Sequence, residues 1–226
     1  MSERAGRGRL TERAYAYVRE GILDGSIPVG TLLVEEEIAA AIGSSRTPVR
    51  HALSQLLQEG LLQVGHRRQL TVRGFTPEHR AEILVLRQAL EGVSVRRACE
   101  LMSVEAIDQL HLNLRRQQRA ASDGLEDDFI DLDEQFHLAI AAGAGLPLLE
   151  RFLRQLREFV RVARLGTRRP AEVLVQVAAE HETILRAIEA RDADAAFAAL
   201  MHHLTHSAYE YSEPVPVPDV SQELEA

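Results

Sequence analysis

Cysteine is almost absent from this chain of 226 residues, which has only Cys99. Lysine is absent altogether, so all 26 basic residues are arginine. A single cysteine excludes an intramolecular disulfide framework and any zinc ribbon built from several cysteines. A bound metal ion would therefore need histidine and carboxylate ligands, and the nine histidines leave that option open.

Long apolar runs are also missing. No segment approaches the ~18 consecutive apolar residues that a membrane span requires, and the first residues, Met-Ser-Glu-Arg, lack the apolar core of a secretory signal. The balance of 46% hydrophobic and 27% charged residues is typical of a globular chain. We expect a soluble cytoplasmic protein with no membrane partner.

Charge is distributed unevenly along the chain. The formal net charge of −8 by itself argues against nucleic acid, because phosphate binding needs local positive charge. Residues 1–75, however, contain 10 arginines and 8 acids, a net charge of +2, whereas residues 76–226 contain 16 arginines and 26 acids, a net charge of −10. The acidic average therefore does not exclude an N-terminal domain that binds nucleic acid.

The N-terminal part has a pattern of three helices followed by a β-hairpin. Apolar residues recur at helical spacing in three segments, and two short strand-like segments follow them. The helices are expected at 10–23, 34–42 and 46–59, and the strands at 61–64 and 70–73. This order predicts a winged helix-turn-helix domain.

The third of these helices has a polar edge at its start. Ser45 is a suitable N-cap and Pro48 falls in the first turn, where its missing N–H costs little. Arg46, Thr47 and Arg50 then lie at the end of a recognition helix that usually meets base edges and phosphates in the major groove. A single arginine at a helix start is more often only a solvated surface residue, but the combined arrangement favours DNA contact.

The expected hairpin has a basic tip. His66, Arg67 and Arg68 lie between the two strands. Such a wing could lie along a neighbouring phosphate backbone or in the minor groove.

Residues 10 to 75 resemble the GntR family of bacterial transcription regulators. The most specific part of the match is the segment from Ser45 to Arg50. The other matching residues are Gly25, Pro28-Val29-Gly30, Leu33, Glu35, Ile38-Ala39, Ile42-Gly43, Ala52-Leu53, Leu56 and Glu59-Gly60-Leu61. The resemblance implies that Arg46, Thr47 and Arg50 touch operator DNA.

Three positions depart from the family pattern. Glu36 stands where many members have a basic residue, His51 replaces a common glutamate, and Gln69 replaces the usual glycine of the wing. A glutamate at position 36 would repel a nearby phosphate, so no DNA contact is carried over to it.

The C-terminal part is almost entirely compatible with helices. Short breaks delimit six of them, and short connections favour antiparallel neighbours in a bundle. They are expected at 77–101, 104–121, 125–142, 147–165, 170–190 and 192–211. The fold class is therefore mainly α, with a flexible N-terminus, a winged domain, a six-helix antiparallel bundle and a flexible acidic tail at 1–9, 10–75, 76–211 and 212–226.

Four side chains of the bundle form a candidate metal site. Asp133 and His137 are four residues apart on one helix face, and His181 and His203 occur on later helices within apolar patterns that turn them inward. A lone inward histidine is more often a hydrogen-bonded core residue than a ligand. Four candidate ligands from three helices are harder to explain that way, because a divalent cation satisfies all of them at once. Three nitrogens and one oxygen suit Zn²⁺ or Ni²⁺.

This half resembles the FCD effector domain of the FadR-like subfamily of GntR regulators over residues 77 to 210. The motifs are Asp133-x-x-Phe136-His137, Glu180-His181-x-x-Ile184-x-x-Ala187-Ile188 and His203-Leu204. The resemblance implies a metal site of Asp133, His137, His181 and His203 at the floor of an effector cavity. Six helices are more similar to the VanR-type branch than to FadR itself, and members that bind acyl-CoA lack this metal set.

Arg87 is a charged residue inside the apolar stripe of the first bundle helix. It could simply form an ion pair with Glu91 one turn later. The resemblance implies instead that it faces the cavity, where a guanidinium could clamp a carboxylate effector. Arg161 or Arg164 could assist, but their periodicity does not decide between cavity and surface.

Three hypotheses of function follow. The first is a homodimeric regulator, most commonly a repressor, that binds a palindromic operator and responds to a small organic acid. The second is a metalloenzyme, which lacks a convincing base because Glu134 and Glu180 should point away from the ion. In the third, the metal is itself the signal or purely structural.

Overall fold

The computed structural model describes residues 2–209, which form two compact units. One unit contains residues up to Thr76 and the short segment 161–165, and the other contains the remainder. The tail expected at 212–226 lies outside the described residues. None of the described helices is long and apolar enough to cross a membrane.

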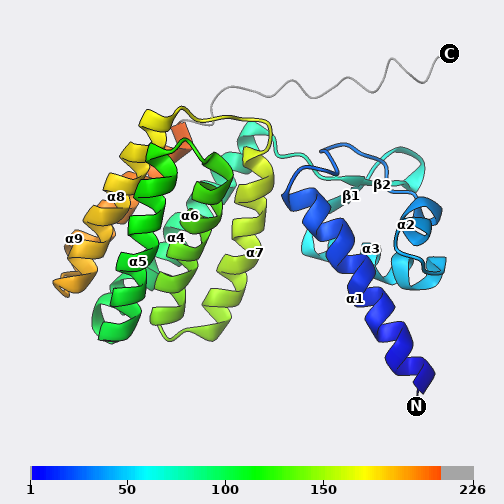
Figure 1. Ribbon diagram of the computed structural model, residues 1–226, viewed down its shortest axis with the longest axis horizontal. Coiled ribbons are helices and arrows are strands. Elements are labelled where there is room, and N and C mark those ends of the chain that lie inside the picture. The colour runs from blue at the N-terminus through cyan, green and yellow to red at the C-terminus, as the bar shows by residue number, and fades with distance from the viewer. Residues whose placement is uncertain (1, 210–226) are drawn as a thin grey trace. The chain divides into compact units, whose positions relative to one another are not determined.

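The N-terminal unit has the predicted order of three helices and a hairpin (Figure 1). Its elements are α1 (Ser2–Leu23), α2 (Glu35–Ala41), α3 (Arg46–Glu59), β1 (Leu62–Val64), a short 3-10 turn (His66–Arg68) and β2 (Leu70–Val72). Helix α1 begins eight residues before the predicted start at Leu10. Extending an existing helix adds a hydrogen bond per residue without a new nucleation cost, which favours this longer helix.

The turn between α2 and α3 is tight because a glycine and an extended serine follow each other closely. Gly43 has a φ of 61°, the left-handed conformation expected of a helix C-terminal glycine. Ser45 occupies the N-cap position with extended backbone, as predicted, although its side chain makes no capping hydrogen bond. This turn sets α3 immediately after α2.

A third segment pairs with the hairpin, and the sequence pattern did not predict it. Strands β1 and β2 pair antiparallel, with Leu62 opposite Val72 and Val64 opposite Leu70. The backbone near Leu32 also bridges β2, through Leu33 N–H donating to Leu70 O at 2.9 Å. The segment preceding α2, where no strand was predicted, therefore extends the small sheet that carries the wing.

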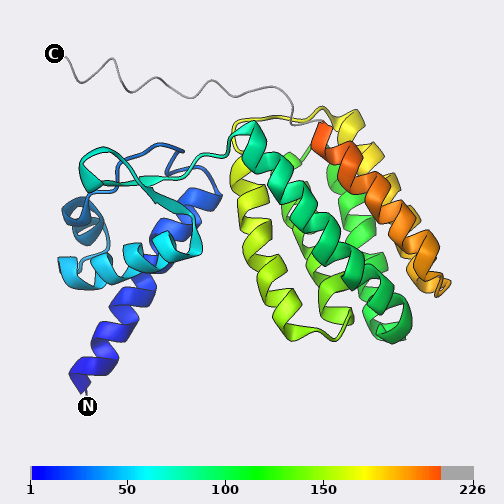
Figure 2. The same ribbon diagram turned by 180° about the vertical axis from the view of Figure 1, so that it is seen from behind.

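The C-terminal unit is a bundle of six helices, each starting within one residue of its predicted position. They are α4 (Pro77–Leu101), α5 (Val104–Ser122), α6 (Glu126–Gly143), α7 (Pro147–Arg164), α8 (Ala171–Glu189) and α9 (Ala193–Tyr209). Helices α4 and α9 pack side by side, as do α5 and α6, and α8 contacts both α5 and α9 (Figures 1 and 2). Inward faces from several helices therefore meet at the centre of the bundle.

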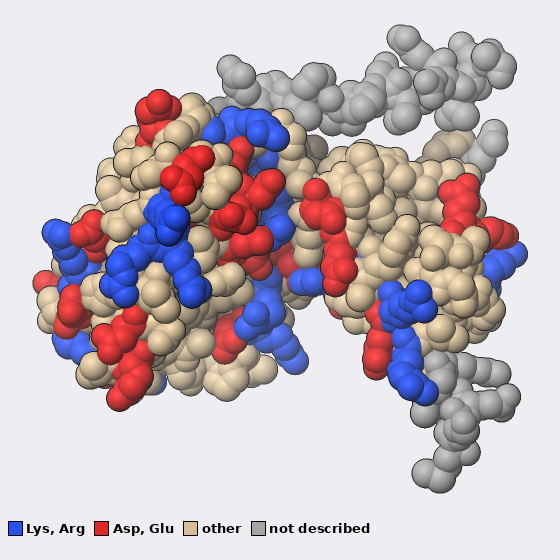
Figure 3. Space-filling view, in the orientation of Figure 1, with Lys and Arg blue, Asp and Glu red and all other residues tan. Residues whose placement is uncertain are grey.

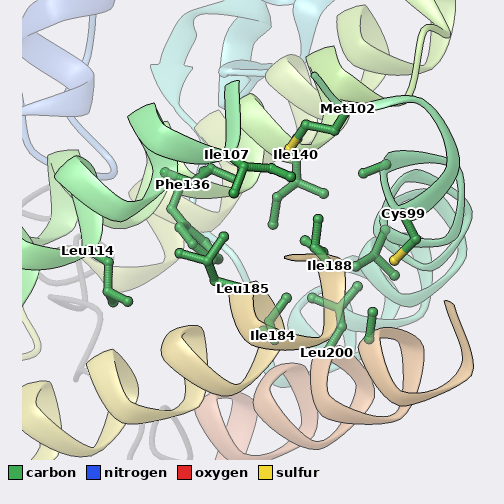
Figure 4. Close-up of a cluster of buried hydrophobic side chains, with 14 of the residues drawn as sticks. Cys99, Met102, Ile107, Leu114, Phe136, Ile140, Ile184, Leu185, Ile188 and Leu200 are labelled. Atoms are coloured by element: carbon green, nitrogen blue, oxygen red, sulfur yellow. The ribbon is translucent and has the colours of Figure 1, made fainter. Parts of the chain in front are cut away.

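An apolar cluster fills one end of this centre. Its members come from α4, α5, α6, α8 and α9 and include Phe136, Ile184, Ile188 and Leu200, all fully or nearly fully buried (Figure 4). Burying such side chains stabilises the fold by about 1.5–3 kcal/mol each. Phe136 directly precedes His137 in α6, so this packing fixes the helix that carries two of the candidate ligands.

Candidate metal centre and DNA-binding surface

Four buried side chains from three helices converge in the bundle. Asp133 and His137 come from α6, His181 from α8 and His203 from α9, and none is more than 2% exposed. Each offers one ligand atom, and these atoms all lie within 4.8 Å of one another. The structure therefore brings together all four residues of the predicted metal site.

The surrounding sequence explains why these side chains point inward. Asp133 and His137 are one helical turn apart on α6, and Ile184 follows His181 by one turn on α8 as a fully buried residue. Leu200 and Leu204 are buried and flank His203 on α9. Each ligand therefore lies on the helix face that the apolar core pulls inward.

The outer nitrogen of each imidazole meets an oxygen. His181 Nδ1 lies 2.7 Å from Gln117 Oε1, His203 Nδ1 lies 2.9 Å from Glu180 Oε2, and His137 Nδ1 lies 2.5 Å from Glu91 Oε2. Amide and carboxylate oxygens only accept hydrogen bonds, so Nδ1 of His181 and of His203 carries the proton and donates. The close approach of His137 Nδ1 to the Glu91 carboxylate favours the same tautomer for His137. The three Nε2 atoms are then left with a lone pair each, which is the form that binds a metal ion.

These lone pairs are directed at one another rather than at donors. The Nε2 atoms of His181 and His203 are 3.3 Å apart, and Asp133 Oδ1 lies 3.6 Å from His181 Nε2. His137 Nε2 is 3.8 Å from the same oxygen. Acceptors facing acceptors in a buried space are unfavourable without a cation. Ligand atoms bound at about 2.1 Å cannot be more than about 4.2 Å apart, so a contraction of a few tenths of an ångström would fit a divalent ion.

Burial also sets the charge state of the ligands. Desolvation, reinforced by the neighbouring His137, lowers the pKa of His181 to about 3, and desolvation together with His181 lowers the pKa of His203 well below its usual value. Both imidazoles are therefore neutral near neutral pH, and a cation does not have to displace a proton from them.

Two buried arginines accompany the acidic groups of this centre. Arg87 Nε donates to Glu91 Oε1 at 2.7 Å, which is the ion pair considered from the sequence. Arg157 Nη2 donates to Asp133 Oδ2. Burial alone would raise the pKa of Glu91, but the neighbouring Arg87 guanidinium, helped by the contact with His137, lowers it, so this carboxylate stays ionised. Each of these two buried carboxylates is thus paired with a buried guanidinium.

Three residues of the centre were not assigned to it from the sequence. Gln117 interrupts the buried stripe of Leu110 and Leu114 on α5, and Arg157 follows the buried Leu153 on α7. A polar residue inside an apolar helix stripe was the signal that could have revealed both. Glu180, which was expected to point away from the ion, lies against His203 Nδ1.

Other histidines and arginines lie outside this centre. His111 pairs with Glu189 on the surface at 3.5 Å, and His206 Nδ1 lies 2.8 Å from Glu180 Oε1. Arg161 and Arg164, for which the sequence did not decide between cavity and surface, belong to the segment 161–165, which is part of the N-terminal unit.

The predicted DNA-contacting residues of α3 are exposed at its start, where acidic residues of α2 hold two of them. Arg46, Thr47 and Arg50 are all exposed. Arg50 Nε and Nη2 donate to the two carboxylate oxygens of Glu35 at 2.9 and 3.0 Å, and this bond lowers the pKa of Glu35. Arg46 Nη1 lies 2.8 Å from Glu36 Oε1. Basic side chains of this unit accordingly lie beside acidic ones (Figure 3).

The wing has a residue in the left-handed backbone conformation directly before Gln69. Arg68 has a φ of 63°, a conformation that usually favours glycine, whereas Gln69 is extended. His66 and Arg68 are exposed at the tip. Arg67 belongs to the same 3-10 turn, and its side chain is not among the described ones.

Comparison with known proteins gives both units a family. Residues 10–72 match the family described as bacterial regulatory proteins, gntR family, and residues 82–206 match the FCD domain. The HTH-type transcriptional repressor RspR of Escherichia coli is 30% identical over 198 residues, covering 86% of both chains.

Solved structures show the same fold. Escherichia coli McbR/YncC superposes with a TM-score of 0.78 at 23% identity, covering 89% of this chain and 96% of that one. A GntR regulator from a Rhodococcus strain gives a TM-score of 0.77 at 22% identity, covering 89% and 96%. Winged helix-turn-helix, helical bundle and whole-length similarity agree, and the chain belongs to the GntR family of DNA-binding transcriptional regulators, with a C-terminal FCD domain.

Proposed function

We propose that this protein is a homodimeric repressor of the bacterial cytoplasm that binds a palindromic operator and is released from it by a small organic acid. The match to RspR, a repressor that covers most of the chain, supports the sign of regulation. Six bundle helices with a complete His and Asp cluster support the VanR-type branch over an acyl-CoA-binding member.

Operator binding is assigned to the exposed start of α3 and to the wing. Arg46, Thr47 and Arg50 would enter the major groove, with His66, Arg67 and Arg68 on the neighbouring backbone or minor groove. The guanidiniums of Arg46 and Arg50 would exchange Glu35 and Glu36 for phosphate or base oxygens. A bidentate contact of arginine with guanine would provide the base readout.

Effector binding is assigned to the buried centre. Asp133, His137, His181 and His203 would hold Zn²⁺ or Ni²⁺, and the positions that remain on the ion would accept a carboxylate oxygen. Arg87 would clamp the acid from the side of α4. The observation that carries this proposal is that three Nε2 lone pairs and a carboxylate oxygen converge in a buried space beside buried guanidiniums.

Two alternatives are weaker. A metalloenzyme is not favoured because the family and the matched relatives are regulators, and because Glu180 is engaged by His203 and His206 rather than directed at the centre. A metal that is itself the signal predicts that its removal alone changes DNA binding.

The test combines metal analysis with effector screening. Purified protein is assayed by mass spectrometry for bound metal and screened for thermal stabilisation by small carboxylates. Hits are then tested for release of an operator selected from a random DNA pool. A carboxylate that stabilises the metal-loaded protein and releases DNA supports the proposal. Release of DNA by chelation alone, with no effect of any acid, would favour the metal as signal.

The role of Arg87 needs a variant that keeps the fold. Arg87→Ala would leave the Glu91 carboxylate buried without its partner, which is strongly destabilising. The double variant Arg87→Gln with Glu91→Gln removes both charges and retains an oxygen that can accept from His137. We expect it to bind operator normally and to lose the response to the acid; a normal response would remove Arg87 from the effector site.

A further inference from the structure

One face of α4 is apolar and exposed. Val85, Leu86 and Val93 are 63%, 51% and 48% exposed, and Ala89 between them is exposed as well. A shallow hollow beside them is lined by Ala81, Glu82, Val85 and Leu86. The opposite face of the same helix packs in the bundle against α9 and α6, and Figure 2 shows α4 at the front next to α9. The apolar face is therefore not part of the bundle core.

The exposed residues recur at the spacing of a helix-pairing seam. Glu82, Leu86, Ala89, Val93 and Arg97 follow one another at intervals of four, three, four and four residues. Intervals of three and four place them on one stripe, as in helices that pair at a shallow angle. The small Ala89 at the centre would allow two backbones to approach closely.

Charge makes this stripe complementary to itself. An acid, Glu82, lies at one end and a base, Arg97, at the other, at equal distances from the midpoint between Ala89 and Leu90. Leu86 and Val93 are equidistant from the same midpoint. When two copies of the helix pair antiparallel about a two-fold axis at that point, Glu82 meets Arg97 of the second copy and Leu86 meets its Val93.

The bonding state of the two charges fits this arrangement. Glu82 makes no hydrogen bond or ion pair within the part of the chain that the structure describes. Arg97 Nη1 lies 3.1 Å from Glu100 Oε2, but both side chains are substantially exposed, at 43% and 60%. An exposed pair of this kind holds little energy, so the Arg97 guanidinium remains able to bind a second carboxylate.

We infer that the outer face of α4 is the surface through which two copies of this chain form the homodimer. The inference rests on the dimer of the proposed function and assigns its interface. Because the two-fold axis crosses α4 near Ala89, the surface is isologous and closed, and the apolar centre is flanked at both ends by one Glu82–Arg97 pair.

Charge reversal tests this pairing by sedimentation velocity. Glu82→Arg and Arg97→Glu should each weaken dimerisation at least about tenfold, because each places like charges opposite one another twice. The double variant Glu82→Arg with Arg97→Glu should restore the dimer. Leu86→Asp should also yield monomers, whereas Val175→Asp, a matched exposed apolar position on α8, should not. Equal thermal melting of all variants would show that folding is unchanged.

Cysteine crosslinking tests the position of the axis. Ala89→Cys should form an intermolecular disulfide on mild oxidation, and Val175→Cys should not; Cys99 is buried and stays in place. If the wild type is a dimer, Leu86→Asp is still a dimer and Ala89→Cys does not crosslink, the α4 interface is overturned and the dimeric regulator stands. A wild type that is monomeric at every concentration, with and without operator, overturns both.

Discussion

Each of the two units contains an ion pair between an arginine and a glutamate, one exposed to solvent and the other buried. In the winged domain, Arg50 and Glu35 form two hydrogen bonds of 2.9 and 3.0 Å with side chains 64% and 23% exposed. In the bundle, Arg87 and Glu91 meet at 2.7 Å with exposures of 5% and 3%. Both pairs lie within hydrogen-bond distance, but their exposure to solvent differs.

Solvent decides what each pair is suited for. An exposed pair is screened by water and salt, so it contributes little and its arginine is readily given to another anion such as a phosphate. A buried pair cannot be opened without leaving a charge in a low-dielectric environment. The exposed arginine of α3 can therefore exchange its glutamate for another anion. In the bundle centre, a charge that loses its partner must gain another opposite charge to stay stable.

Of the substitutions that test this comparison, the removal of Arg157 should cause the largest change, a loss of folding stability. Arg157→Ala leaves Asp133 buried without its guanidinium, and we expect the metal-free protein to lose about 3–5 kcal/mol of stability in urea unfolding. Arg154→Ala, which breaks a pair with Glu150 on the exposed side of the same helix, should cost less than about 1 kcal/mol. Equal losses from the two variants would refute the contrast. Added metal should reduce the loss in Arg157→Ala, because a cation then compensates Asp133.

Removal of the hydrogen bond that orients His181 should cause the next largest change, a loss of metal affinity. Gln117→Leu removes the oxygen that holds His181 Nδ1 while keeping a side chain of similar size. We expect metal affinity to fall about 10- to 100-fold in competition with a chelator dye, because the orientation and tautomer of His181 are no longer fixed. Gln118→Leu changes the neighbouring residue, which contacts Glu182 on the surface, and should have no effect. An unchanged affinity in Gln117→Leu would mean that the hydrogen bond from His181 to Gln117 does not support metal binding.

The sequence predicted the helices and the four candidate ligands well, for a common physical reason. Apolar periodicity specifies which helix face is buried, and the candidate ligands Asp133 and His181 lie on such faces. The neighbours of these ligands were harder to foresee. Gln117 and Arg157 each come from a helix without a candidate ligand, so their contact depends on how α5 and α7 pack against α6 and α8, which local periodicity does not specify.

The charge pairing between α2 and α3, on the predicted DNA-binding surface, could not be predicted from the sequence for a related reason. The sequence led us to assign no DNA contact to Glu36, but it did not predict the pairing of Glu36 with Arg46, which depends on the angle between α2 and α3. That angle is set by the turn at Gly43 and by the packing of Ile38 and Val49, both buried. Neighbours across a helix pair are a property of the packed domain, not of either segment.

Truncating an arginine of α3 should act on DNA binding without affecting the fold. Arg50→Ala should weaken operator binding roughly tenfold or more in a gel-shift titration and reduce its salt dependence, because a charged contact to the DNA is lost. Its melting temperature should stay the same, since the pair with Glu35 is exposed. Arg115→Ala, an arginine of the bundle, is the control. An unchanged gel-shift midpoint would remove Arg50 from the contact surface.

The smallest expected effect is a gain in operator affinity. Glu36→Gln removes the carboxylate that competes with DNA for Arg46 and that repels phosphate, so operator affinity should rise a few-fold at low salt and converge with wild type at high salt. Glu37→Gln removes the same charge from the same helix at a residue with no ion pair among the described side chains, and separates general electrostatics from release of Arg46. Equal gains in both variants would mean that only net charge matters. A loss of affinity in Glu36→Gln would show that Glu36 orients Arg46 for its contact, so that even an exposed pair can be part of the recognition surface.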